Sequence, residues 1–88
     1  MDKVIKVILL TNSERLVSEI VEVGADVGEP DCRLIKPHEI WEGHNLSPWM
    51  MDDTNQTEFM ISSDKIITLA DPNSKLLEKY NSLTNEGS

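Results

Sequence analysis

The chain alternates short apolar runs with clusters of turn-forming residues, which is typical of β-strands joined by tight turns. Residues 3–10 are rich in β-branched side chains and precede a polar Thr-Asn-Ser cluster, so they predict a first strand. Residues 32–41 predict another strand. Pro37 lies within this run, and we expect a bulge or break there because proline has no N–H to donate to the ladder.

The clearest pair of strands lies near the C-terminal end. Residues 57–62 and 65–70 predict two short strands joined by a tight polar turn. Within the first strand, Phe59 and Ile61 fall on one face and Met60 on the other, because side chains alternate along a strand.

Residues 14–23 fit two interpretations. Leu16, Ile20 and Val23 recur at helical spacing, with a serine before the segment and a glycine after it, which are typical helix ends. The high content of valine and isoleucine instead favours a strand. The pattern alone leaves both interpretations open.

A helix is predicted over residues 72–84, after the last strand. The Asp71 side chain can accept a hydrogen bond from the first free amides, and Pro72 fits the first helical position because that position needs no N–H. One apolar stripe follows the helical period and comprises Leu76, Tyr80 and Leu83.

The segment between the third strand and the strand pair is the least regular. Residues 42–56 contain a glycine, a proline, two asparagines and the acidic pair Asp52-Asp53, so we expect an irregular loop. Trp49, Met50 and Met51 are costly to leave in water. We expect them either to pack on their own domain or to contact another subunit.

Length and cysteine content limit the ways in which the chain gains stability. Its 88 residues predict one domain over residues 1–88 with a small core. Cys32 is the single cysteine, so no disulfide forms within the chain, and a reducing, cytoplasmic location is expected. The apolar run at residues 4–10 is too short to cross a membrane. Self-association is therefore the expected source of additional stability.

The charge balance argues against nucleic-acid partners. Sixteen acidic residues face eight basic ones, which gives a formal net charge of −8. Nucleic acid attracts clustered lysine and arginine, whereas the basic residues of this chain are dispersed. We therefore expect no DNA or membrane partner, and charge also disfavours RNA.

The order of the predicted elements resembles the Sm-like family of small β-barrels. Residues 7–17 are similar to the first two strands of that family and the turn between them, and residues 59–69 are similar to its second motif. The Leu46-Ser47-Pro48-Trp49 loop resembles that of Sm-like proteins from cyanophages and marine metagenomes. The resemblance implies a mainly β fold: a five-stranded, bent antiparallel barrel with strands at about residues 3–10, 14–23, 32–41, 57–62 and 65–70. It thus favours a strand over residues 14–23.

The resemblance also implies a homo-oligomeric ring of about five to seven subunits, encoded by a phage and acting in the cytoplasm of the infected host cell. The outer strands of an open barrel have unpaired backbone groups, and pairing between neighbouring subunits satisfies these groups. We expect the subunit contact to include Phe59, Met60, Ile61, Ile66, Ile67 and Trp49.

The turn between the last two strands departs from the family pattern. Sm-like proteins usually carry Arg-Gly at this turn, where arginine contacts RNA, whereas this chain has two serines. The matching end of the first motif also lacks the family's asparagine. If RNA is bound at this turn, the ligand-binding residues are Ser62, Ser63, Asp64 and Lys65.

Catalytic and metal sites have weak support in the sequence. His38, Glu42 and His44 do not have the spacing of a zinc helix, and they are more simply solvated loop residues. Cys32 has no adjacent family signature and is more simply a small buried hydrophobic residue. We expect no catalytic residue, no metal and no cofactor, and we do not expect an enzyme.

Three functions remain open at this point. The first is a ring-forming assembly or binding module, the second is an RNA-binding ring in RNA metabolism or regulation, and the third is a small enzyme. Charge and the serine pair at the turn favour the first over the second, while the third rests on no group of residues.

Overall fold

The computed structural model describes residues 3–42 and 45–84 of the chain. They form an antiparallel, mainly β fold with one C-terminal helix. The strands form six runs rather than the five expected from the sequence. The elements are β1 (Ile5–Leu10), β2 (Arg15–Glu22), β3 (Cys32–Trp41), β4 (Asn45–Pro48), β5 (Glu58–Ile61), β6 (Ile66–Ala70) and α1 (Ser74–Thr84).

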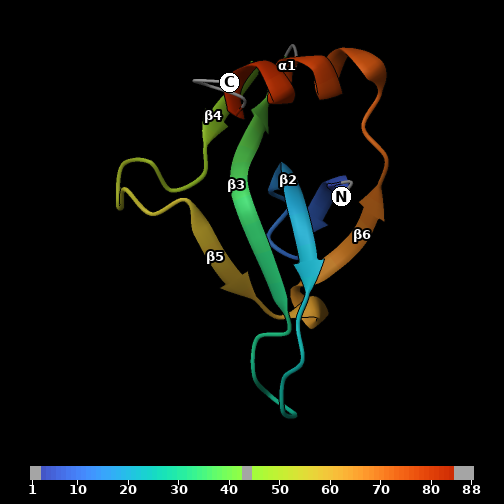
Figure 1. Ribbon diagram of the computed structural model, residues 1–88, viewed down its shortest axis with the longest axis vertical. Helices are drawn as coiled ribbons and strands as arrows, with labels where there is room; N and C mark the ends of the chain where they lie inside the picture. Colours follow the sequence, from blue (N-terminus) through green and yellow to red (C-terminus); the bar gives the residue numbers. More distant parts are fainter. Residues whose placement is uncertain (1–2, 43–44, 85–88) are drawn as a thin grey trace.

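The strands belong to one strongly bent sheet with β3 as its longest member. The order is β4-β3-β2-β1-β6, and β5 pairs with β3 on the same side as β4. The first half of β3 pairs with β5 and the second half pairs with β4. Figure 1 shows β5 and β6 on opposite sides of the molecule, with α1 across one end of the strands.

Residues 14–23 contain a strand, β2, because its two faces contact two different cores. Leu16 belongs to a concave core with Ile8 and Leu34. The next residue, Val17, belongs to a second core, which it shares with α1. A strand covered on both faces carries consecutive apolar residues, and this is why its sequence also fitted a helix.

The bend of β3 is built at the predicted proline. Lys36 has a φ of 54°, in the left-handed region, and Pro37 follows it. The register of β2 against β3 shifts between Val17 and Glu19, opposite this bend. Such a bulge turns a strand and leaves a ladder group without its regular partner.

The helix supplies the missing partner at the bulge. The backbone N–H of Glu19 donates to the Tyr80 hydroxyl at 3.1 Å, and this hydroxyl donates to the Ile35 carbonyl at 3.0 Å. The fully buried Ser18 hydroxyl lies 3.1 Å from the same carbonyl. Burial raises the pKa of Tyr80, so the neutral phenol is favoured at this position. The hydrogen bonds of Tyr80 fasten α1 to the bent sheet.

The start of α1 differs from the prediction. The helix begins at Ser74, and the Asn73 side chain caps it by accepting a hydrogen bond from the Leu76 N–H at 2.9 Å. Asp71 does not serve as the cap; its carboxylate instead pairs with Lys6 at 2.5 Å. Leu76 and Tyr80 are buried as the stripe predicts, whereas Leu83 is exposed.

Among the described residues, no helix has the length and apolar character needed to span a membrane.

Candidate functional site

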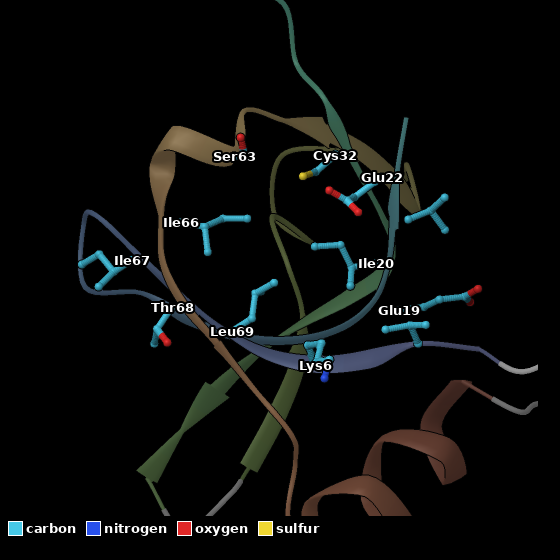
Figure 2. Close-up of a pocket in the computed structure, with 12 residues that line it drawn as sticks. Lys6, Glu19, Ile20, Glu22, Cys32, Ser63, Ile66, Ile67, Thr68 and Leu69 are labelled. Carbon is cyan, nitrogen blue, oxygen red and sulfur yellow. The ribbon is translucent and has the colours of Figure 1, made fainter. Parts of the chain in front are cut away.

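A groove of about 740 Å³ lies between β6 and β2. We call it the β6 groove. Figure 2 shows Ile66 and Leu69 of β6 and Ile20 of β2 pointing into the space that separates the two strands. The groove is mainly apolar, with charged groups among its lining, and it is formed by Val4, Lys6, Glu19, Ile20, Val21, Glu22, Cys32, Ser63, Ile66, Ile67, Thr68 and Leu69.

The groove exists because β6 has a strand partner on only one side. Within the described residues β6 pairs with β1 alone, and four of its five residues are exposed. Leu69 faces the concave core beside Ile8, its register partner, yet 46% of its surface is exposed. Ile67 lies where the register slips and is 61% exposed. β6 therefore combines an open backbone edge with uncovered apolar side chains.

The opposite side of the sheet has a second open edge at β5. In the described part of the chain β5 pairs only with β3. Met60, in the middle of β5, is 47% exposed. Within the described residues the sheet thus ends in β6 on one side and in β5 and β4 on the other, and each of these strands pairs with one neighbour only.

The turn between β5 and β6 is fastened to the start of β3. The Ser63 backbone N–H donates to one carboxylate oxygen of Asp31 at 2.7 Å, and the Ser63 hydroxyl donates to the other at 2.8 Å. These two hydrogen bonds hold the pKa of Asp31 below its ordinary value, because they stabilise the ionised carboxylate. The polar turn is therefore a structural clamp at one end of the β6 groove.

The four residues considered for RNA binding do not share one surface. Ser63–Lys65 form a 3-10 turn, and Ser63 lines the β6 groove. Ser62 and Lys65 instead line a separate hollow beside Asn12. Because both Ser63 donors are engaged by Asp31, they are not available to a phosphate in this arrangement.

The six residues expected at a subunit contact divide into two groups. Trp49, Ile61 and Ile66 pack against the concave core, and Phe59 packs against Trp49 with ring centroids 5.2 Å apart. Met60 and Ile67 are the two that remain largely exposed. Trp49 therefore packs within its own chain, which the sequence left open.

Sequence reasoning missed the side of the groove that β1 and β2 provide. Val4 and Val21 are 52% and 39% exposed, and both line the groove. They belong to segments that read as ordinary strands. Val4 and Val21 stay exposed because β6 is separated from β2. This separation is a tertiary property that local sequence does not reveal.

Cys32 and His38, considered as catalytic or metal-binding residues, are both buried in the structure. Cys32 is 5% exposed within the concave core, and burial raises the pKa of its thiol, so the reactive thiolate is disfavoured. His38 is buried beside the bend of β3, while His44 lies outside the described residues. Across residues 3–42 and 45–84, no three potential metal ligands gather at one point.

The acidic pair of the long loop belongs to a hollow of about 440 Å³ on another part of the surface. Asp52 and Asp53 line it together with Glu14, Glu39 and Trp41. Burial and the nearby Glu14 raise the pKa of Glu39. The Trp41 ring is held by a 2.7 Å hydrogen bond from its Nε1 to the Ser47 hydroxyl. An aromatic surface surrounded by four carboxylates repels a phosphate backbone.

A model of a family of unknown function, DUF6561, matches residues 3–85. The match covers almost the whole chain. The chain belongs to the DUF6561 family. No curated protein matches this DUF6561 chain.

Proposed function

We propose that the protein is an assembly module whose copies join edge to edge, with β5 of one copy beside β6 of the next. The observation that carries this proposal is the β6 groove, in which exposed apolar side chains border a strand with one free side. In this assembly the partner strand satisfies the backbone groups of β6, and its side chains cover the groove.

Open strand edges favour such pairing on physical grounds. An edge strand has unpaired N–H and C=O groups and readily adds another strand. Proteins commonly protect such edges with charged residues, but β6 carries none along Ile66–Ala70. Its exposed residues include Ile67 and Leu69, which are costly to leave in water. Pairing with another copy removes both costs.

The two edges differ, which determines the kind of assembly. A contact between β5 and β6 is head-to-tail, so it leaves one β5 and one β6 open until the chain of subunits closes. The family resemblance adds the expectation of Sm-like barrels that form a ring of about five to seven copies. The bent β3 and the order of strands around it are compatible with such a barrel.

The described surface offers little support for the RNA-binding alternative. Two of the basic side chains face carboxylates: Lys6 pairs with Asp71, and Arg33 lies 3.5 Å from Glu58. The net charge of −8 adds a repulsive field. Binding of oligo-U or oligo-A would contradict the proposal of a pure assembly module, if the RNA binds at low salt and the affinity falls steeply as salt increases.

Substitution of the exposed edge residues tests the proposed contact. We expect Ile67→Lys and Met60→Lys to lower the native mass to that of a monomer, because each places a charge in an apolar interface. Val27→Lys is the matched control, since Val27 is fully exposed in the β2–β3 loop. Light scattering measures the mass of all three. Edge variants with the same mass as the control would rule out the β5–β6 contact.

A further inference from the structure

A smaller cavity of about 210 Å³ lies at the bend of β3, away from the β6 groove. It is formed where the bend meets the end of β4, the start of β5 and the last turn of α1. The two cavities have no lining residue in common. Its apolar walls come from two prolines, two aromatic rings and a leucine: Pro37, Pro48, Trp49, Phe59 and Leu83.

Most of the polar groups at this cavity are engaged within the chain. The Lys36 ammonium donates to the Thr84 carbonyl at 3.1 Å, and the Thr84 hydroxyl donates to the Tyr80 carbonyl at 2.9 Å. The Gln56 side-chain amide donates to the Glu58 carbonyl. These groups shape the cavity, and each has at least one of its donors engaged within the chain.

His38 is a buried titratable residue of the lining. It is 92% buried, with 8% of its surface exposed. Its Nδ1 lies 2.9 Å from the Lys36 carbonyl, and because a carbonyl can only accept, Nδ1 carries the proton of this hydrogen bond. The Tyr80 ring meets the imidazole edge-on at 5.6 Å and holds its orientation.

The second ring nitrogen of His38 is available as an acceptor. In the neutral ring Nε2 is an acceptor, and no hydrogen bond to it occurs within the described residues. No fully buried side-chain nitrogen or oxygen in this part of the chain lacks a partner. Nε2 is therefore not fully buried, and His38 lines the cavity.

We propose that this cavity, which we call the His38 pocket, binds a single aromatic ring that carries one hydrogen-bond donor, of the phenol or indole type. The size fits, since an apolar cavity of about 150 Å³ is known to hold benzene. The apolar walls bury the ring, and Nε2 accepts the hydrogen bond from the donor. A free small molecule and a tyrosine or tryptophan side chain of a polypeptide share this chemistry.

Titration of the ¹⁵N-labelled protein with phenol and with toluene tests the pocket. The two probes have nearly the same shape, but toluene lacks the donor. We expect saturable shifts for phenol at Trp49, Phe59 and Leu83, together with a change in the Nε2 resonance of His38. We expect toluene to bind about fivefold more weakly, which is the effect of one net hydrogen bond.

Two variants localise the binding. Leu83→Trp fills the pocket from an exposed position of α1, so it should abolish phenol binding while the fold is retained. Val27→Trp adds the same side chain to an exposed loop and should leave binding unchanged. The proposal is overturned if phenol does not saturate, if toluene binds equally well, or if Leu83→Trp binds phenol as tightly as Val27→Trp.

A capped tyrosine amide distinguishes the two sources of the ring. If it binds at least as tightly as phenol, with the same Nε2 shift, the pocket receives a side chain of a polypeptide. If phenol binds and the capped amide does not, the pocket receives a free small molecule.

Discussion

At the scale of single residues, Tyr80 links the helix to the bent sheet. Its hydroxyl accepts from the Glu19 N–H and donates to the Ile35 carbonyl, two groups that lie beside the bulge of β3 where the β2–β3 register shifts. The side chain is 2% exposed, so water cannot replace these contacts. The Tyr80 hydroxyl thus supplies hydrogen-bond partners for two backbone groups at the bend of the strand pair.

Tyr80→Phe should destabilise the fold by about 1–3 kcal/mol, because it keeps the ring but leaves the Glu19 amide buried without its partner. Urea unfolding measures the loss. Ser82→Ala is the control, since Ser82 is exposed on the same helix. A loss for Tyr80→Phe no larger than that of Ser82→Ala would show that the hydroxyl does not stabilise the bend.

Asp31 and Ser63 provide a second test at this scale. The two hydrogen bonds from Ser63 hold the pKa of Asp31 below its ordinary value of about 3.9. A carboxylate whose pKa is lowered by folding stabilises the fold at pH values above its ordinary pKa. This contribution to stability is lost as the pH falls through the pKa of the folded state.

Ser63→Ala should therefore raise the pKa of Asp31 towards its ordinary value, since one of the two hydrogen bonds is lost. Titration of the side-chain carboxyl carbon by NMR measures the change. Ser62→Ala is the matched control, because Asp31 contacts Ser63 and not its neighbour. An equal pKa in both variants would contradict the clamp.

At the scale of elements, α1 covers the second core of the sheet. Leu76 and Tyr80 pack there with Val17 and Ile40, while Leu83 on the same helix is 47% exposed. The docking of α1 therefore depends on the first two turns of its apolar stripe.

Leu76→Ala should cost about 2–5 kcal/mol in unfolding free energy, because it leaves a cavity beneath the helix. Leu83→Ala makes the same chemical change at an exposed position and should cost less than about 1 kcal/mol. Thermal or urea unfolding compares the two variants. Similar losses would mean that α1 does not pack on the sheet through this face.

Much of the element order was predictable, and the exceptions have physical causes. Four strands and the helix lie close to the ranges that the local pattern predicted, because alternation and turn residues are local signals. β2 lies in the range that the pattern left open and for which the family resemblance favoured a strand. β4 was missed, since four residues that include a proline form a strand only because the second half of β3 offers its edge. The helix starts two residues later than predicted, with Asn73 as its cap, while Asp71 pairs with Lys6, which is 65 residues away in sequence.

The site was less predictable than the fold. Of the residues expected at a subunit contact, Met60 and Ile67 are exposed, whereas Trp49, Ile61 and Ile66 pack on the concave core. Local sequence cannot separate these two groups, because both are apolar residues of short segments. Which of these residues are exposed depends on the distance between β6 and β2. That distance is determined by the curvature of the whole sheet.

At the scale of the whole molecule, a small acidic chain has two open sheet edges. Hydrophobic residues and backbone groups at β5 and β6 favour association, while a net charge of −8 on each copy opposes it. Salt screens this repulsion, so we expect higher ionic strength to favour the assembly. Binding to RNA would respond in the opposite sense.

The native mass of the unmodified protein, measured by light scattering across a range of salt concentrations, tests the central claim most directly. The chain has a mass of 9.9 kDa, so a ring of five to seven copies has a mass of roughly 50–70 kDa. We predict a single species in this range that is retained or strengthened as salt increases. A species of 9.9 kDa at every salt concentration would contradict the assembly of the chain through its open edges.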